Sequence, residues 1–182
     1  VVIIDYKTGT VSEKLNDIYF GKKIQLYMYL KVFLDEGKTA AGVFYMPIKT
    51  NYNKNGSVYK FVGQVYNDLD TLRELDNNFT EGEFKSGIYD FKVKKNKSGF
   101  GADGKHVALG KDDFVSICDY VVKISEIALT EISEGFRERK PFESACKYCA
   151  FSSMCGEEDD RKGKGVDGMN SFCDGEDDNE QS

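Results

Sequence analysis

The first seven residues, VVIIDYK, constrain the fold more than any other stretch of the chain. Four branched apolar residues run directly into Asp5, Tyr6 and Lys7, which predicts a buried β-strand with polar residues at its end. Because side chains alternate along a strand, Asp5 and Lys7 lie on the same face. An acid and a lysine at the mouth of a buried sheet form either a salt-bridged strand end or part of a functional site.

The following segments predict a helix and a second strand. Residues 22–35 carry apolar side chains at helical spacing, and Gly37 lies just past the end of this pattern. Residues 39–48, TAAGVFYMPI, predict a buried strand, and Pro47 favours a sheet edge at its end. If the two strands are parallel, the unit is a right-handed crossover of the α/β type.

The rest of the chain predicts strands at 61–66 and 87–93, a short helix at 68–76 and a long helix at 111–134. The strand at 87–93 ends in a basic loop, KVKKNKSGFGADGKH. The long helix has acids in its first turn and Gly135 as its stop signal. Its apolar face is predicted to comprise Phe114, Ile117, Cys118, Val121, Ile124 and Ala128.

The net charge of −6 argues at first against a nucleic-acid partner. However, Glu157 to Ser182 carries −7, so residues 1–156 carry +1. That acidic tail is poor in apolar residues, and we expect it to be disordered. No run approaches the ~20 apolar residues of a membrane helix, and no signal peptide is visible, so we expect a cytoplasmic protein with no membrane partner. Because Val1 already lies in a strand pattern, we expect the chain to be the C-terminal part of a longer protein.

Gln25 and Tyr29 are a second pair of candidate site residues. They are four apart in the predicted helix and share one of its faces. The alternative is that Tyr29 is a core aromatic residue and Gln25 a surface residue. The spacing alone leaves both interpretations open.

Three cysteines lie within ten residues in ACKYCAFSSMC: Cys146, Cys149 and Cys155. C-x-x-C is a common metal-ligand spacing, and a third cysteine nearby favours a metal or iron–sulfur site over unrelated thiols. A disulfide does not suit a cytosolic chain. A tetrahedral site needs four ligands, but Cys118 lies on an apolar helix face as a small core residue, and Cys173 lies in the acidic tail.

Taken in order, VVIIDYKTG, KKIQLYMYL, GVFYMPI and ISEGFRERKPFESACKYCAFSSMC resemble the C-terminal nuclease domain of AddB subunits of AddAB helicase-nucleases, a RecB-like branch of the PD-(D/E)XK nucleases. The resemblance spans nearly all of residues 1–156. It implies an α/β restriction-endonuclease-like core, a mixed sheet flanked by helices, incomplete at its N-terminus. Within it, 49–110 would be a peripheral segment and 111–156 a helix followed by the cysteine motif, with 157–182 as the tail.

The resemblance also implies roles for the residues at the end of the first strand. Asp5 and the carbonyl of Tyr6 would bind Mg2+, for which such oxygens are suitable hard ligands. Lys7 would position or activate the attacking water, whose pKa the metal lowers. Gln25 and Tyr29 would line the DNA side of the same site.

The three cysteines would hold a [4Fe-4S] cluster. In the family, another metal-binding acid and the fourth cluster cysteine lie upstream of the positions that match Val1. We therefore expect residues 1–182 alone to have an incomplete metal site and to be inactive.

The function implied is a Mg2+-dependent single-strand DNA exonuclease domain that processes double-strand ends for recombinational repair, with an AddA-type helicase-nuclease subunit as partner. One alternative is a stand-alone RecB-like iron–sulfur exonuclease of the CRISPR-associated type. The other is a non-catalytic iron–sulfur or zinc module that binds DNA. The segment 49–110 favours AddB over the stand-alone exonuclease. The intact pair Asp5 and Lys7 argues against the non-catalytic module.

Overall fold

The computed structural model describes residues 1–9, 11, 14–48, 60–77, 79, 84–96, 99–103, 108–136, 146, 149–151 and 154. The chain divides into two compact units, one of Val1–Lys14 and Ile24–Val121 and the other of Leu15–Lys23 and Val122–Ser182. The predicted disordered tail at 157–182 lies outside the described residues, as do Cys155 and Cys173.

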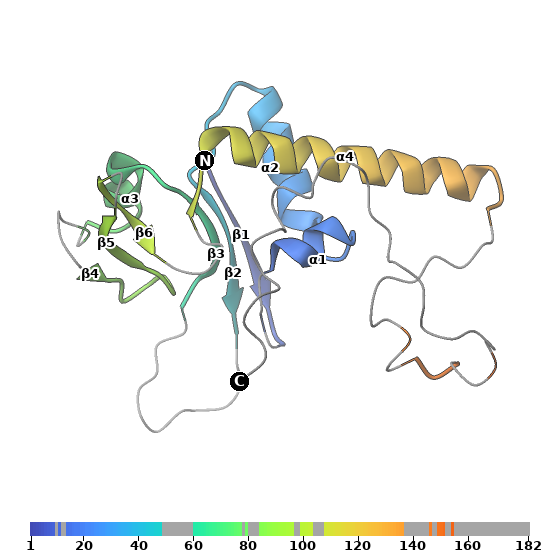
Figure 1. The fold of residues 1–182 in the computed structure, drawn as a ribbon, viewed down its shortest axis with the longest axis horizontal. Coiled ribbons are helices and arrows are strands. Elements are labelled where there is room, and N and C mark those ends of the chain that lie inside the picture. The colour runs from blue at the N-terminus through green and yellow to red at the C-terminus, as the bar shows by residue number, and fades with distance from the viewer. Residues whose placement is uncertain are drawn as a thin grey trace. The chain divides into compact units, whose positions relative to one another are not determined.

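The first unit is built on a mixed sheet with the strand order β1-β2-β3-β7. Figure 1 labels the first three of these strands, which lie side by side. Its strands are β1 (Val2–Lys7), β2 (Gly42–Pro47), β3 (Val62–Tyr66) and β7 (Ala108–Leu109). β1 runs parallel to β2, β3 runs antiparallel to β2, and β7 runs parallel to β3. The predicted mixed sheet and its strands at 1–7, 39–48 and 61–66 are thus confirmed.

The position of Pro47 follows from this pairing. β3 pairs only with Gly42 to Tyr45 of β2, so Pro47 lies past the end of that ladder. A proline, which has no N–H group to donate, is tolerated at such a position. β1 is the outer strand of the described part of the sheet, and its C-terminal end is therefore accessible from one side.

Helix α2 (Gln25–Asp35) connects β1 to β2 and packs against both strands. It buries Leu26, Tyr27 and Leu30 and ends at Gly37, which adopts the left-handed conformation that glycine favours. The helix begins three residues later than the predicted start at 22. The residues before it form a turn in which Gly21 has φ +73°, which an L side chain rarely adopts.

Helix α4 (Lys111–Ser133) matches the predicted long helix. Its predicted apolar face is buried only as far as Val121, which is also where the first unit ends. Ile124 is half-buried, and Ala128 is exposed. The short helix α1 (Leu15–Tyr19) in the second unit was not predicted, because five residues are too few to show a helical period. In the described ranges, no helix has the length and apolar character needed to cross a membrane.

The other face of the main sheet is covered by α3 (Leu69–Leu75) and a second, antiparallel sheet with the order β4-β5-β6. This sheet comprises β4 (Phe84–Lys85), β5 (Lys92–Asn96) and β6 (Gly99–Asp103). A shared core joins these elements to β2 and β3: Phe44, Val65, Leu72, Phe79, Tyr89, Phe91, Val93 and Ala102.

The prediction of a strand at 87–93 followed by a basic loop is wrong. β5 begins only at Lys92, and the described part of the predicted loop forms the antiparallel strands β5 and β6, in which Lys92 is the register partner of Asp103. Phe91 and Val93, two positions apart, are buried and supply enough apolar contact for a strand, although lysines alternate with them. Residues 49–110, set apart from the core in the domain prediction, contribute β3 and β7 to the main sheet.

Candidate active site at the end of β1

Asp5 and Lys7 lie side by side on the face of β1 that α2 covers. Their side chains form an ion pair, with 2.6 Å between Lys7 Nζ and Asp5 Oδ2. The side chains are 25% exposed for Asp5 and 41% exposed for Lys7. Both groups are therefore restrained by the fold and still accessible to a ligand.

Gln25 and Tyr29 join this pair through hydrogen bonds. Lys7 Nζ donates to Gln25 Oε1 at 3.4 Å, and Gln25 Nε2 donates to Tyr29 OH at 2.9 Å. Tyr29 is 50% exposed, so it is not a core aromatic residue. The structure thus brings all four candidate side chains into one connected group, in which α2 supplies two residues and β1 the other two.

Tyr45 is a further member of this group that sequence reasoning missed. It is the register partner of Asp5 on β2, and its ring centroid lies 5.3 Å from Lys7 Nζ. Tyr45 is 3% exposed, so the ring offers a buried face to the ammonium group. Such a contact attracts a cation through the negative face of the ring. Tyr45 can be identified from the register of β1 and β2, but the sequence does not specify that register.

The Asp5 carboxylate is placed to interact with a cation. Its Oδ2 atom is buried, and its partner among the described residues is the Lys7 ammonium, 2.6 Å away. A buried carboxylate is stable only beside groups that offset its charge. This end of β1 is therefore a site where positive charge is favoured.

The carbonyl of Tyr6 is a second oxygen at the same strand end. The carbonyl oxygens of Val1 and Lys7 accept hydrogen bonds from the β2 side, from Ala41 N and Ile48 N. Because carbonyl groups alternate in direction along a strand, that of Tyr6 points away from β2. One carboxylate and one main-chain carbonyl at the same strand end fit the oxygen preference of Mg2+.

Tyr27 fixes the position of α2 against the sheet and against α4. Its hydroxyl donates to Gln64 Oε1 on β3 at 2.9 Å, and its carbonyl accepts from Cys118 Sγ on α4 at 3.5 Å. Tyr27, Gln64 and Cys118 are all buried. Because Gln25 and Tyr29 lie two residues to either side of Tyr27, these contacts also hold the two site residues in place.

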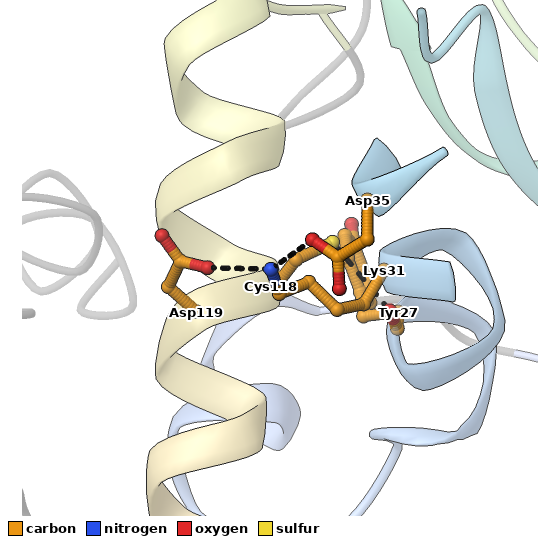
Figure 2. A network of polar contacts seen from close by, with 5 residues as sticks. All are labelled: Tyr27, Lys31, Asp35, Cys118 and Asp119. Atoms are coloured by element: carbon orange, nitrogen blue, oxygen red, sulfur yellow. Dashed lines mark hydrogen bonds and ion pairs between the residues drawn. The ribbon is translucent and has the colours of Figure 1, made fainter. Parts of the chain in front are cut away.

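Lys31 provides the outer connection between the same two helices. Its ammonium lies 2.5 Å from Asp35 on α2 and 3.4 Å from Asp119 on α4 (Figure 2). The hydrogen bond to Asp35, and next the one to Asp119, raise the pKa of Lys31 above its ordinary value. Figure 2 shows this bridge beside the buried contact between Cys118 and Tyr27.

Cys118 is a buried core residue, as the sequence predicts. Burial, and then the nearby charge of Asp119, raise the pKa of its thiol to about 12. A thiol of this kind stays protonated near neutral pH. Its burial and this pKa fit the role of a small core residue.

Of the cysteine motif, the structure describes Cys146 and Cys149, both in the second unit and both free thiols. Cys149 N donates to the carbonyl of Cys146 at 3.2 Å, so the two residues share one tight turn. Cys146 is half-buried and Cys149 is exposed. Among the described residues, no group of three His, Cys, Asp or Glu side chains is arranged to hold a metal ion. The cluster thus stays a prediction.

Comparison with known proteins relates this geometry to a family. Residues 1–156 match the PD-(D/E)XK nuclease superfamily. The curated relatives are named as B-type subunits of an ATP-dependent helicase/deoxyribonuclease. That of Clostridium botulinum strain Hall is 31% identical over 179 residues, which cover 84% of this chain and 15% of the relative. That of Caldanaerobacter subterraneus subsp. tengcongensis is 33% identical over 187 residues, which cover 90% of this chain and 16% of the relative. The chain therefore spans about 15% of the length of these relatives.

The buried thiol of Cys118 predicts a specific dependence of stability on pH. An unfolded cysteine has a pKa of about 8.5, whereas the folded one has a pKa of about 12. The stabilisation that the buried thiol provides is complete below the pKa of the unfolded chain. It is lost as pH rises toward the pKa of the folded chain, because the unfolded chain releases its proton first. In urea unfolding between neutral and alkaline pH, the free energy of unfolding should fall by up to ~1.4 kcal/mol per pH unit.

Two variants test the assignment of this slope. Cys118→Ala should reduce it, and Cys149→Ala, which removes an exposed thiol, should leave it unchanged. Parallel profiles for the native chain and Cys118→Ala would contradict the assignment.

Proposed function

The chain belongs to the PD-(D/E)XK nuclease superfamily, and we propose that it is the metal-dependent DNA-cleaving domain of a helicase–nuclease subunit. The observation that carries the proposal is the connected group of Asp5, Lys7, Gln25 and Tyr29 at the end of β1. This group lies inside the segment that matches the superfamily. The names of the relatives, which combine a helicase and a deoxyribonuclease, support DNA as the substrate.

The proposed metal is Mg2+, held by Asp5 Oδ2 and the carbonyl of Tyr6. The accessible carboxylate of Asp5 and the outward carbonyl of Tyr6 support this choice. When bound, the ion supplies a Lewis acid for the phosphate and lowers the pKa of a water molecule. Further ligands from elsewhere in the complete protein would complete its coordination.

Lys7 and its neighbours position the attacking water. Lys7 is the only one of the four that carries a positive charge, and it orients the attacking water while offsetting charge on the phosphate. The ion pair with Asp5, the hydrogen bond to Gln25 and the ring of Tyr45 restrict its ammonium to a small region. A positioned ammonium loses little entropy when substrate binds. Gln25 and Tyr29 present an amide and a hydroxyl that can contact the DNA strand.

At the level of the whole enzyme, we propose that this domain cuts single strands produced from DNA double-strand ends during recombinational repair. An AddA-type helicase-nuclease subunit would be the partner that unwinds the duplex with ATP. The support is the word "subunit" in the names of the relatives and their much greater length, of which this chain spans about 15%.

Replacing Lys7 tests the proposed chemistry. In the complete helicase–nuclease, Lys7→Ala should lower Mg2+-dependent DNA cleavage by roughly a hundredfold to ten-thousandfold, the usual contribution of such a group. DNA binding and ATP hydrolysis should change little, because the ammonium acts in the cleavage step. Lys14→Ala, at an exposed lysine of the same unit, is the matched control. Near-native cleavage by Lys7→Ala would refute the role.

We further propose that Cys146, Cys149 and Cys155 bind a [4Fe-4S] cluster, with a fourth ligand from another part of the complete protein. Two observations support it. The C-x2-C-x5-C spacing is typical of metal sites, and the free thiols of Cys146 and Cys149 share one turn. A centre that joins distant segments would stabilise the fold by limiting the unfolded chain. Its role would therefore be structural.

Cysteine replacements test the cluster. Iron, acid-labile sulfide and visible absorption should be present in the anaerobically purified complete protein and lost in Ser variants of Cys146, Cys149 or Cys155. Cys118→Ser and Cys173→Ser should keep all three signals. Stoichiometric zinc without sulfide would replace the cluster with a zinc site. Loss of iron in Cys118→Ser but not in Cys149→Ser would overturn the ligand assignment.

A further inference from the structure

The charge of the chain is unevenly distributed around the second sheet. The segment from Phe84 to Leu109 contains six lysines and two aspartates, a net charge of +4 in a chain whose total is −6. A local excess of lysine against an acidic background is a typical electrostatic mark of a surface that binds phosphate groups.

The strands place three of these lysines, Lys85, Lys92 and Lys94, on one face. Phe91 and Val93 point into the core, so Lys92 and Lys94, which alternate with them, belong to the outer face of the sheet. On β4, Lys85 is the register partner of Lys92, and both are exposed. Lys85, Lys92 and Lys94 thus form a basic face, with about 6.7 Å between alternate residues of β5.

This arrangement is unfavourable for the isolated sheet. Like charges directly opposite each other in an antiparallel pair destabilise it. Within the described residues, neither Lys85 nor Lys92 forms an ion pair, and the exposed Asp90 does not reach them. The register partner of Lys92 on β6 is Asp103, and the segment as a whole keeps its net charge of +4. An anionic ligand would relieve the repulsion.

The basic face is held firmly to the main sheet. Asn67, which follows β3, accepts a hydrogen bond from Ala102 N at 2.9 Å and donates its own N–H to the carbonyl of Leu109 at 2.9 Å. Gly101 makes this approach possible, since a Cβ there would overlap Asn67 Oδ1. A surface that is ordered before binding loses little entropy when a ligand arrives.

We propose that the basic face of Lys85, Lys92 and Lys94 binds the phosphate backbone of the DNA strand that the nuclease domain cuts. The inference rests on the proposed nuclease function, because a domain that cuts DNA must bind the backbone that it cleaves. Contacts with phosphates position a nucleic acid without reading its bases. Lysine, a flexible point charge, suits such contacts. The basic face is separate from Asp5 and Lys7, so its contribution is to substrate binding.

Lysine footprinting tests the surface directly. The complete protein, in EDTA to prevent cleavage, is acetylated with and without a saturating single-stranded oligonucleotide, and the modified peptides are quantified by mass spectrometry. Acetylation of Lys85, Lys92 and Lys94 should slow severalfold with DNA, while that of the exposed Lys38 and Lys111 should not change. Equal rates at the basic face with and without DNA would overturn the proposal.

Charge removal gives a second measurement. Replacing the three lysines with Gln should lower the affinity for the oligonucleotide and reduce the slope of log K against log salt by up to ~2, from about 0.7 for each lost phosphate contact. Replacing Lys38, Lys111 and Lys123 with Gln changes the net charge equally and should leave the slope unchanged. Arg at the three basic positions should preserve binding. An equal loss in both Gln variants would show a general charge effect and overturn the proposal.

These results are independent of the proposed catalytic chemistry. Binding in EDTA does not require Asp5 or Lys7 to function, whereas cleavage by Lys7→Ala is measured with Mg2+. Protected lysines together with an active Lys7→Ala variant would reject the catalytic assignment and keep the DNA surface. Unprotected lysines together with an inactive Lys7→Ala variant would keep the catalytic site and reject the basic face.

Discussion

The parallel pairing of β1 with β2 is the interaction on which the candidate site depends. Its register sets Asp5 beside Tyr45. The ammonium of Lys7 therefore contacts both Asp5 on β1 and the ring of Tyr45 on β2. The same pairing uses the carbonyl of Lys7 and leaves that of Tyr6 directed to the open side of β1. A shift by one residue would move Asp5 and Lys7 to the opposite face of the sheet and separate them from α2.

The position of α2 is the second requirement, and the core supplies it. Tyr27 is bonded to β3 through its side chain and to α4 through its backbone, while Lys31 bridges carboxylates on α2 and α4. Removing either partner of the buried contact between Tyr27 and Gln64 would leave a polar group unsatisfied, which costs about 1–3 kcal/mol. The geometry of exposed residues such as Gln25 and Tyr29 thus depends on buried contacts that never meet the substrate.

Much of the first unit could be predicted from sequence because its signals are local. Four apolar residues before Asp5, a helical period ending at Gly37 and the run GVFYMP each specify one element. The hairpin of β5 and β6 could not be predicted in this way, since its lysines mask an alternation that depends on burial against Phe44 and Leu72. The role of Tyr45 depends on register, and the limit of burial at Val121 depends on which parts of the chain pack on α4. Neither is encoded in a short stretch of residues.

The central claim is that Asp5 and Tyr6 bind the metal that a DNA-cleaving site needs, and anomalous diffraction tests it most directly. Mn2+, which shares the preference of Mg2+ for oxygen ligands, would be diffused into crystals of the complete protein. The account predicts an anomalous peak within direct coordination distance, roughly 2.0–2.3 Å, of Asp5 Oδ2 and the carbonyl of Tyr6. The peak should be absent in Asp5→Asn. A fully occupied Mn2+ site elsewhere, with Asp5 paired only to Lys7, would contradict the account.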